Sequence, residues 1–290
     1  MTATLPRLTS PRVPSAPRAA ASVARRVTLG IPPTVLISFL IVLVVVLWSL
    51  VPGVFTAQSP VTGDTAQKLA APSAAHWFGT DYLGRDLFAR VVHGTAASVT
   101  SALVAVLIGL VIGGAIGLAS GFLAGWVDSA LGRLVDVLLA IPGFLLAVVI
   151  VSSLGFQTIN AAIATGVSAV AVFARLTRAE VIKGRNAVFV EASYLGGGTR
   201  VHALLQHILP NAYRSVVALA VLQFGTSILI IASLAFLGYG DPPPSSEWGL
   251  LVASGKTYPT APWLVYAPAV VIVVTVLSVN RISRWMRKTS

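Results

Sequence analysis

The sequence predicts an all-α integral membrane protein with six transmembrane helices. Of its 290 residues, 56% are hydrophobic and only 10% are charged, whereas a soluble domain carries about 25% charged residues. The few charges divide the chain into long uncharged runs, and a helix needs about 20 apolar residues to cross a bilayer. Both ends of the chain are basic and contain no acidic residue, which predicts two cytoplasmic termini and therefore an even number of crossings.

The uncharged runs set the expected helices. They cover residues 27–63, 91–127, 137–174, 215–240 and 257–280. Four of them suit one crossing each, and the 137–174 run is long enough for two, with a polar reversal at "LGFQTIN" (154–160). Two crossings in the 91–127 run would make seven in total, so the cytoplasmic termini favour a single crossing there.

These helices give the expected organisation of the chain. Its parts are a disordered basic cytoplasmic tail at 1–30, a first transmembrane helix at 31–52, an extracytoplasmic loop at 53–95, a five-helix transmembrane core at 96–281 and a cytoplasmic tail at 282–290. The first tail is rich in Pro, Ser, Ala and Arg, a composition that cannot bury enough surface to fold. A cleaved secretory signal is the alternative interpretation, but the apolar run favours a retained helix.

Charge also assigns the loops to the two sides of the membrane. The segment at 175–213 is predominantly basic, so it is expected in the cytoplasm, whereas the loops at 53–95 and 241–262 are nearly balanced and are expected outside. The net charge of +11 comes from basic residues scattered between apolar runs. Topology explains that scatter better than nucleic-acid binding does.

Five glycines recur at every fourth position of the second expected helix. They are Gly109, Gly113, Gly117, Gly121 and Gly125. On a helix this spacing makes a groove of small residues that lets another backbone approach closely. We therefore expect this glycine stripe to pack against a neighbouring helix.

The third expected helix opens with "RLVDVLLAIPG". Arg133 and Asp136 are three residues apart on one helix face, so they are expected to pair near the membrane interface. Pro142 is expected to kink the helix. No other acidic residue lies at mid-membrane depth in any expected helix, which argues against an ion-coupled carrier.

Patterns typical of catalysis, nucleotide binding and metal binding are missing from the sequence. Gly255, Lys256 and Thr257 resemble the end of a phosphate-binding loop, but the first glycine of that motif is misplaced and no strand precedes it. His202 and His207 are five residues apart, which is a poor spacing for a shared metal. The chain also has no cysteine, which excludes disulfides and thiolate metal sites. We expect a non-catalytic protein without a metal site or a cofactor of its own.

The basic segment at 175–213 has the pattern of a helix pair. Residues 186–195 and 200–208 each suit a short helix, and three consecutive glycines at 196–198 permit a turn between them. Pro210 is expected to end the second helix before the fifth transmembrane helix begins. A helix pair with one apolar and one polar side can dock in a protein groove or rest on lipid headgroups.

This segment resembles the EAA loop of permease subunits of ABC importers, whose pattern is E-A-A-x-x-x-G with nine residues before I-x-L-P. Here Ser193 replaces the second alanine and His207 replaces the isoleucine. In that family the loop forms a coupling helix that sits in a cleft of the ATPase subunit. The resemblance assigns this contact to Glu191, Ala192, Ser193, Gly197, His207, Leu209 and Pro210.

Three further stretches resemble the dipeptide/oligopeptide/nickel branch of these importers, specifically the second of its two paired permeases. They are "HWFGTDYLGRDLFARVVHG" (76–94), "GWVDSALGRLVDVLLAIPG" (125–143) and "SLAFLGYGDPPPSSEWGLLVASG" (233–255). The end of the chain departs from the family, because "NRISRWMRK" (280–288) replaces a common N-x-x-G-D-x-L-R-D pattern.

The resemblance implies a type I ABC importer permease architecture in the inner (plasma) membrane, surrounded by lipid. The expected partners are a second permease, two ATP-binding subunits that hold ATP and Mg²⁺, and an extracytoplasmic solute-binding protein. The implied cargo is a short peptide, with nickel, metal chelates or another small solute as the alternative. A carrier that works without an ATPase is a further alternative, but it requires intramembrane ion-coupling groups or inverted repeats, and neither is visible.

Two further sets of residues are candidates for contact with solute or with the binding protein. The outer loops are expected to meet the binding protein or to shape the outer mouth, through Asp81, Gly84, Arg85, Asp86, Asp241 and Trp248. A structural role, in which Arg85 and Asp86 pin the loop to the membrane edge, is the alternative. Polar candidates for the translocation path are Gln157, Asn160, Gln223 and Ser227.

Overall fold

The computed structural model describes residues 32–289, and the regular structure within that range is helical. An isolated bridge between Thr80 and Asp86 is the one β-type pairing in the described part of the chain. From Pro33 onward the chain forms one compact unit. The tail expected to be disordered, residues 1–30, lies outside the described residues.

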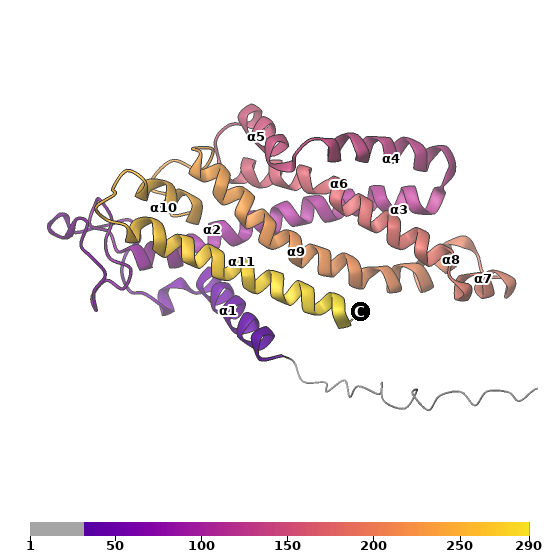
Figure 1. The fold of residues 1–290 in the computed structure, drawn as a ribbon, viewed down its shortest axis with the longest axis horizontal. Coiled ribbons are helices and arrows are strands. Elements are labelled where there is room, and N and C mark those ends of the chain that lie inside the picture. Colours follow the sequence, from indigo (N-terminus) through magenta and orange to yellow (C-terminus); the bar gives the residue numbers. More distant parts are fainter. Residues whose placement is uncertain (1–31, 290) are drawn as a thin grey trace, which may run out of the picture. The chain divides into compact units, whose positions relative to one another are not determined.

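The helices differ widely in length (Figure 1). The long ones are α1 (Pro33–Leu50), α2 (Leu87–Ile108), α6 (Thr158–Arg185), α9 (Leu209–Phe236) and α11 (Trp263–Thr289). The shorter ones are α3 (Gly114–Leu123), α4 (Gly125–Ala140), α5 (Gly143–Leu154), α7 (Val188–Leu195), α8 (Arg200–Ala203) and α10 (Trp248–Gly255). Two π-helical segments, Gly109–Gly113 and Leu204–Ile208, join α2 to α3 and α8 to α9. Two 3₁₀ turns, Pro52–Val54 and Thr65–Gln67, lie between α1 and α2.

Five continuous helical stretches among the described residues are long and apolar enough to cross a membrane. They are Pro33–Leu50, Leu87–Leu123, Thr158–Arg185, Arg200–Phe236 and Trp263–Lys288. A sixth crossing requires α4 and α5 to count as one broken span, because they meet at a bend of 89° around Pro142. The bend lies at the proline where a kink was expected, because proline cannot donate a backbone hydrogen bond within a helix. The prediction of an all-α membrane fold is confirmed.

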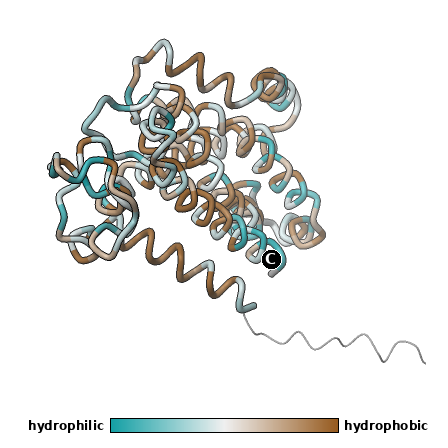
Figure 2. Tube along the Cα trace, turned by 60° about the vertical axis from the view of Figure 1, so that its left-hand side comes forward, coloured by the Kyte–Doolittle hydropathy of each residue, from teal (hydrophilic) through white to brown (hydrophobic). Residues whose placement is uncertain are grey.

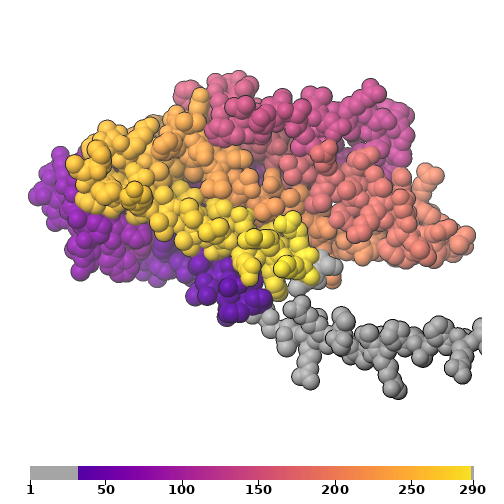
Figure 3. Space-filling model, viewed as in Figure 1, coloured from indigo at the N-terminus to yellow at the C-terminus, as the bar shows by residue number. Residues whose placement is uncertain are grey.

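The two ends of this unit differ in what they carry (Figure 1). The loop from 51 to 86 and α10 lie at one end, and α7 and α8 lie at the other. In the space-filling view, α7 and α8 project beyond the neighbouring helix ends (Figure 3). The hydropathy colouring shows hydrophobic residues along most of α1 and hydrophilic residues gathered in the loops (Figure 2). We refer below to the α10 end and the α7 end.

Three helix boundaries and one additional helix differ from what the charges predict. α2 begins at Leu87 rather than near residue 96, because Arg90 is buried within it and does not mark a membrane surface. α9 is continuous with the preceding segment through Pro210, and α11 extends to Thr289, beyond the core boundary expected at 281. α10 forms inside a segment that was expected to be a plain outer loop.

The glycine stripe lies against α6. A Cβ atom added at Gly113 would lie 2.3 Å from the carbonyl oxygen of Val170, and one at Gly117 would lie 2.4 Å from that of Ala174. Gly109 and Gly121 also face α6, where an added Cβ would meet side chains at 2.9 Å. The two backbones therefore touch over three turns of helix.

Gly125 does not belong to this contact, although it continues the four-residue spacing. It follows the end of α3 with a φ of +62°, and an added Cβ there would meet nothing within 4 Å. The helix has already ended at Leu123, so periodicity no longer places the residue on the same face. Its glycine serves the turn into α4.

We expect Gly113→Ala to destabilise the protein and Gly114→Ala to leave it unchanged or slightly more stable. The added methyl group at Gly113 collides with the α6 backbone, and overpacking of this kind costs about 1–3 kcal/mol. An added Cβ at Gly114, one residue further on, meets nothing within 4 Å. Thermal unfolding of the two variants in detergent checks this, and equal melting temperatures would contradict the close contact.

Candidate functional site

α7 carries three of the seven residues assigned to the coupling loop, and it is held by one buried side chain. Val190 is fully buried, whereas Val188 is 80% exposed and Leu195 is 86% exposed. Val190 packs with Val181 of α6 and with two buried residues that follow α7 in the chain. We call this group the anchor cluster: Val181, Val190, Ala203 and Ile208, lined by Leu118, Phe122 and Leu204.

The anchor cluster joins α7 to two long helices at once. Val181 belongs to α6, and Leu118 and Phe122 belong to α3. One turn further along the same face of α6, Gly184 leaves room for Ile208, since a Cβ added there would lie 3.0 Å from the Ile208 side chain. The loop is therefore packed onto the transmembrane helices by apolar contacts, rather than being linked to them by chain alone.

The outer face of α7 combines a carboxylate with apolar side chains. Glu191 and Ala192 are exposed, and Phe189, Tyr194 and Leu195 are exposed around them. Exposed apolar groups gathered on a projecting helix are typical of a surface that contacts another protein. Ser193, on the same helix, is half-buried.

The turn after α7 explains why Gly197 stands where it does. Gly197 has a φ of +86°, and its N–H donates to the carbonyl of Tyr194 at 3.0 Å. The N–H of Gly198 donates to the carbonyl of Ser193 at 2.9 Å. These two bonds form a Schellman motif, in which the residue with positive φ is usually glycine. Thr199 then caps α8 by accepting a hydrogen bond from the N–H of His202 at 3.2 Å.

The segment after the turn continues into α9 without a break, which corrects the expectation that Pro210 ends a helix. The N–H of Leu209 donates to the carbonyl of Leu204, five residues back, in a π-helical turn. A π-helical turn shifts the hydrogen-bond register directly before the proline, and this shift accommodates a residue without an N–H. Pro210 is exposed and Leu209 is half-buried.

His207 lies inside the loop rather than on its outer face. Its ring centroid is 6.1 Å from that of Phe189 and 6.0 Å from that of His202. The ring is half-buried, and its carbonyl accepts a hydrogen bond from the Asn211 amide at 2.7 Å. Within the described residues, no group of three or more potential ligands is placed to hold a metal ion.

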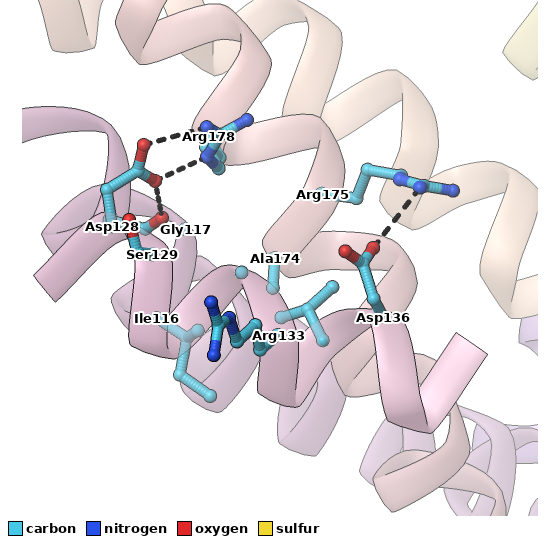
Figure 4. Close-up of a pocket in the computed structure, with 12 residues that line it drawn as sticks. Ile116, Gly117, Asp128, Ser129, Arg133, Asp136, Ala174, Arg175 and Arg178 are labelled. Atoms are coloured by element: carbon cyan, nitrogen blue, oxygen red, sulfur yellow. Dashed lines mark hydrogen bonds and ion pairs between the residues drawn. The ribbon is translucent and has the colours of Figure 1, made fainter. Parts of the chain in front are cut away.

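A cluster of charges at the α7 end ties three helices together (Figure 4). Arg178 of α6 donates to both carboxylate oxygens of Asp128 at 2.6 and 2.8 Å, and Ser120 of α3 also donates to Asp128. Asp128 lies in α4, so the three side chains join α3, α4 and α6. Sequence analysis missed this cluster. The sequence feature that indicates it is Asp128, a carboxylate that directly follows the glycine stripe.

The pair expected between Arg133 and Asp136 is not the one that forms. Asp136 Oδ1 lies 3.4 Å from Arg175 Nη2, and both side chains are about two-thirds exposed. Packing of α6 beside α4 brings Arg175 within reach, and an exposed i, i+3 pair on one helix is too weak to compete strongly. Arg133 instead lines a cavity of about 420 Å³ beside both aspartates.

At the α10 end, Asp81 is the centre of a buried charge network. Its carboxylate accepts hydrogen bonds from Arg85 Nε and Arg90 Nη1, both at 2.7 Å, and from the N–H groups of Leu83 and Arg85. Burial raises the pKa of Asp81, but these backbone and guanidinium donors lower it further, so the pKa lies below its usual range. Arg90, which lies in α2, also donates to the carbonyl of Ser245 at 2.9 Å and so ties α2 to the segment before α10.

The other outer candidates are also built into the fold. Asp86 caps α2 through the N–H of Ala89 and contacts His76, and Asp241 accepts from the N–H of Thr158 at 3.0 Å. Gly84 has a φ of +71° and lies against the backbone of Asp64. Trp248 is fully buried, and its indole N–H donates to the carbonyl of Val91 at 3.1 Å.

These outer side chains hold the loop in shape. Asp81, Arg85, Asp86 and Trp248 are each at most 5% exposed, so they offer almost no surface to another protein. Glu247 was missed by sequence analysis. It is fully buried, where burial raises its pKa, and it caps α10 by accepting from the N–H of Leu250 at 3.0 Å.

The four path candidates lie in two places. Gln157 is exposed, and the Asn160 amide closes the turn between α5 and α6 by donating to the carbonyls of Leu154 and Gly155. Gln223 and Ser227 are one helical turn apart on α9, half-buried and buried respectively. The hydrogen bonds that Asn160 makes in this turn thus account for a polar residue at this position.

Comparison with known proteins gives one family. Residues 109–289 match the model of the family described as binding-protein-dependent transport system inner membrane component. That range contains the glycine stripe, the anchor cluster and the exposed face of α7.

Several relatives match over most of their length. A dipeptide transport system permease protein of Alkalihalophilus pseudofirmus is 36% identical over 80% of this chain and 77% of its own. A probable D,D-dipeptide transport system permease protein of Escherichia coli is 36% identical over 87% of this chain and 84% of its own. A glutathione transport system permease protein of Shigella flexneri is 42% identical over 74% of this chain and 72% of its own. A solved structure, the crystal structure of an amino acid ABC transporter with histidines, matches 69% of this chain and 94% of its own, with a TM-score of 0.53 and 18% identity.

Proposed function

The chain belongs to the family of binding-protein-dependent transport system inner membrane components, and from this membership we propose that its α7–α8 loop is the docking surface for a partner ATPase subunit. It is a multi-pass, non-catalytic permease subunit of an ABC importer, and ATP hydrolysis lies in partner subunits. Such a permease works in a complex with another permease, ATPase subunits and a binding protein. ATP and Mg²⁺ are bound by the ATPase subunits in this proposal.

The observation that carries this proposal is the contrast between the two sides of α7. The side with Val190 is packed into the anchor cluster, and the side with Glu191, Tyr194 and Leu195 is exposed. A partner that holds the exposed side therefore acts on α6 and α3 through the buried side. Transmission requires both properties, since a loosely tethered loop would absorb the movement.

The proposed cargo is a short peptide. The named relatives at 36–42% identity carry dipeptides, D,D-dipeptides or glutathione according to their names, and each of these is a short peptide. The binding protein that delivers the cargo selects it, so this chain forms part of the path and does not fix the specificity alone. The path runs between this chain and the second permease in this proposal.

The proposed orientation places the α7 end and both termini in the cytoplasm. The segment at this end is rich in arginine and lysine, and the C-terminal helix also ends there with three arginines and a lysine after Asn280 that no acidic residue offsets. Positive charge flanking membrane helices is retained on the cytoplasmic side.

We expect Gly197→Val to reduce ATP-driven uptake about tenfold and Gly197→Asn to retain it. Valine is strained at a φ of +86° by about 1–2 kcal/mol, whereas asparagine tolerates this region. An added Cβ at Gly197 meets nothing within 4 Å, so conformation alone separates the two variants. Peptide uptake by the complete transporter in proteoliposomes, normalised to the amount inserted, checks this. Full uptake with valine would argue against a defined loop geometry.

Single cysteines at Leu195 and Val61 test the orientation. The chain has no native cysteine, and both side chains are exposed, in α7 and in the loop at the α10 end. In intact spheroplasts that express the chain without ATPase subunits, we expect a membrane-impermeant maleimide to label Val61→Cys, and to label Leu195→Cys only after permeabilisation. The reverse pattern of labelling would refute the orientation.

A further inference from the structure

A second cavity at the α7 end is formed where α6, α9 and α11 meet behind α7. Its volume is about 560 Å³, and we call it the basic cavity. Its charged lining residues are Lys183, Arg214, Arg287 and Glu180, and its apolar wall includes Phe189 and Pro210. These residues come from four separate helices.

The basic cavity differs from the cavity of Figure 4 in its charge balance. The Figure 4 cavity has three arginines, and its two aspartates accept from two of them. In the basic cavity three cations face a single carboxylate, and none of the three forms an ion pair with another described residue. The cavity therefore has an unbalanced positive charge and room for an anion.

One of the three cations lies at the depth of lipid headgroups, and the other two lie just outside that layer. Arg214, Arg287 and Lys183 stand one, seven and nine residues beyond the uncharged stretches of their helices. At the helical rise Arg214 lies about 1.5 Å past the edge of the hydrocarbon and the other two lie about 10 to 14 Å past it, whereas the headgroup layer is about 5–8 Å thick. Long basic side chains reach back toward that layer.

A favourable interaction with the helix dipole accounts for the positions of two of the three cations. Lys183 and Arg287 lie in the last turns of α6 and α11, where positive charge interacts favourably with the helix dipole. Arg214 has no such role, because it lies inside the continuous helix that runs from Arg200 to Phe236. All three nevertheless line the same cavity.

We propose that the basic cavity binds the phosphodiester headgroup of an anionic membrane lipid. The phosphate accepts hydrogen bonds from the arginine and lysine donors, and the acyl chains run along the apolar surfaces of the helices. Phe189 of α7 forms part of the wall, so a bound headgroup also contacts the docking loop. The proposal requires only that the chain spans a membrane, and it stands whether or not an ATPase binds α7.

The test compares two double variants, each of which loses two positive charges. Lys183→Gln/Arg287→Gln removes two cations of the cavity, and Arg284→Gln/Lys288→Gln removes two exposed cations from the same end of α11 that do not line it. Full-length chain is purified in detergent and titrated with phosphatidylglycerol, and native mass spectrometry counts the lipids retained. Each cation that contacts the bound headgroup contributes roughly fivefold to its affinity, so we expect at least about tenfold weaker retention in the cavity variant. The control is expected to retain lipid like the wild type, because its two cations do not line the cavity.

Two further measurements show whether the bound anion is a lipid headgroup or a soluble phosphate. Phosphatidylcholine, which has no net charge, is expected to bind weakly and equally to all forms. Inorganic phosphate is expected to displace phosphatidylglycerol poorly; efficient displacement would assign the cavity to a soluble anion and overturn the lipid proposal. Equal retention of phosphatidylglycerol by the two variants would overturn it as well. Neither result bears on ATPase docking, which the uptake of Gly197 variants tests separately.

Discussion

The close contact between the glycine stripe and α6 is the constraint on which the rest of the structure depends. It brings the carbonyl groups of Val170 and Ala174 against Gly113 and Gly117. Along the same face of α6, the next turns place Arg178 beside Asp128 and Val181 in the anchor cluster. The contact therefore aligns the charged cluster and the support of α7 on one helix. A wider spacing of the two backbones would separate both from their partners.

The two ends of the molecule are held by different forces, and the difference suits different roles. At the α10 end, buried ion pairs and helix caps fix the loop from within, and the charged side chains are withdrawn from the surface. Such networks specify one geometry because each donor requires its partner. At the α7 end, apolar packing holds one side of a helix and leaves the other exposed. This second arrangement offers a surface to a partner and keeps it attached to the membrane helices.

The sequence predicts the long helices and the turn at the glycines after α7. Both depend on local properties: the length of an apolar run sets a membrane helix, and glycine permits the backbone of a turn. The sequence fails where distant residues decide the outcome. Charge spacing places Arg90 at a membrane surface, yet the side chain is buried beside Asp81, which neutralises it. The local pattern predicts that Pro210 ends a helix, yet a π-helical turn accommodates it. Asp136 was assigned to Arg133 on its own helix, but α6 supplies Arg175. The buried role of Val190 depends on residues of α3 and α6 that local pattern cannot place nearby.

The central claim is that α6 and the segment from the start of α7 to Ile208 move as one body during transport. A disulfide between Gly184→Cys and Ile208→Cys tests it directly, because a Cβ added at Gly184 lies 3.5 Å from the Ile208 Cβ, a separation that disulfides favour. The chain has no cysteine of its own to interfere. The account predicts that the oxidised transporter imports peptide at the rate of the reduced form. Loss of uptake on oxidation, with recovery on reduction and no effect in either single variant, would contradict it.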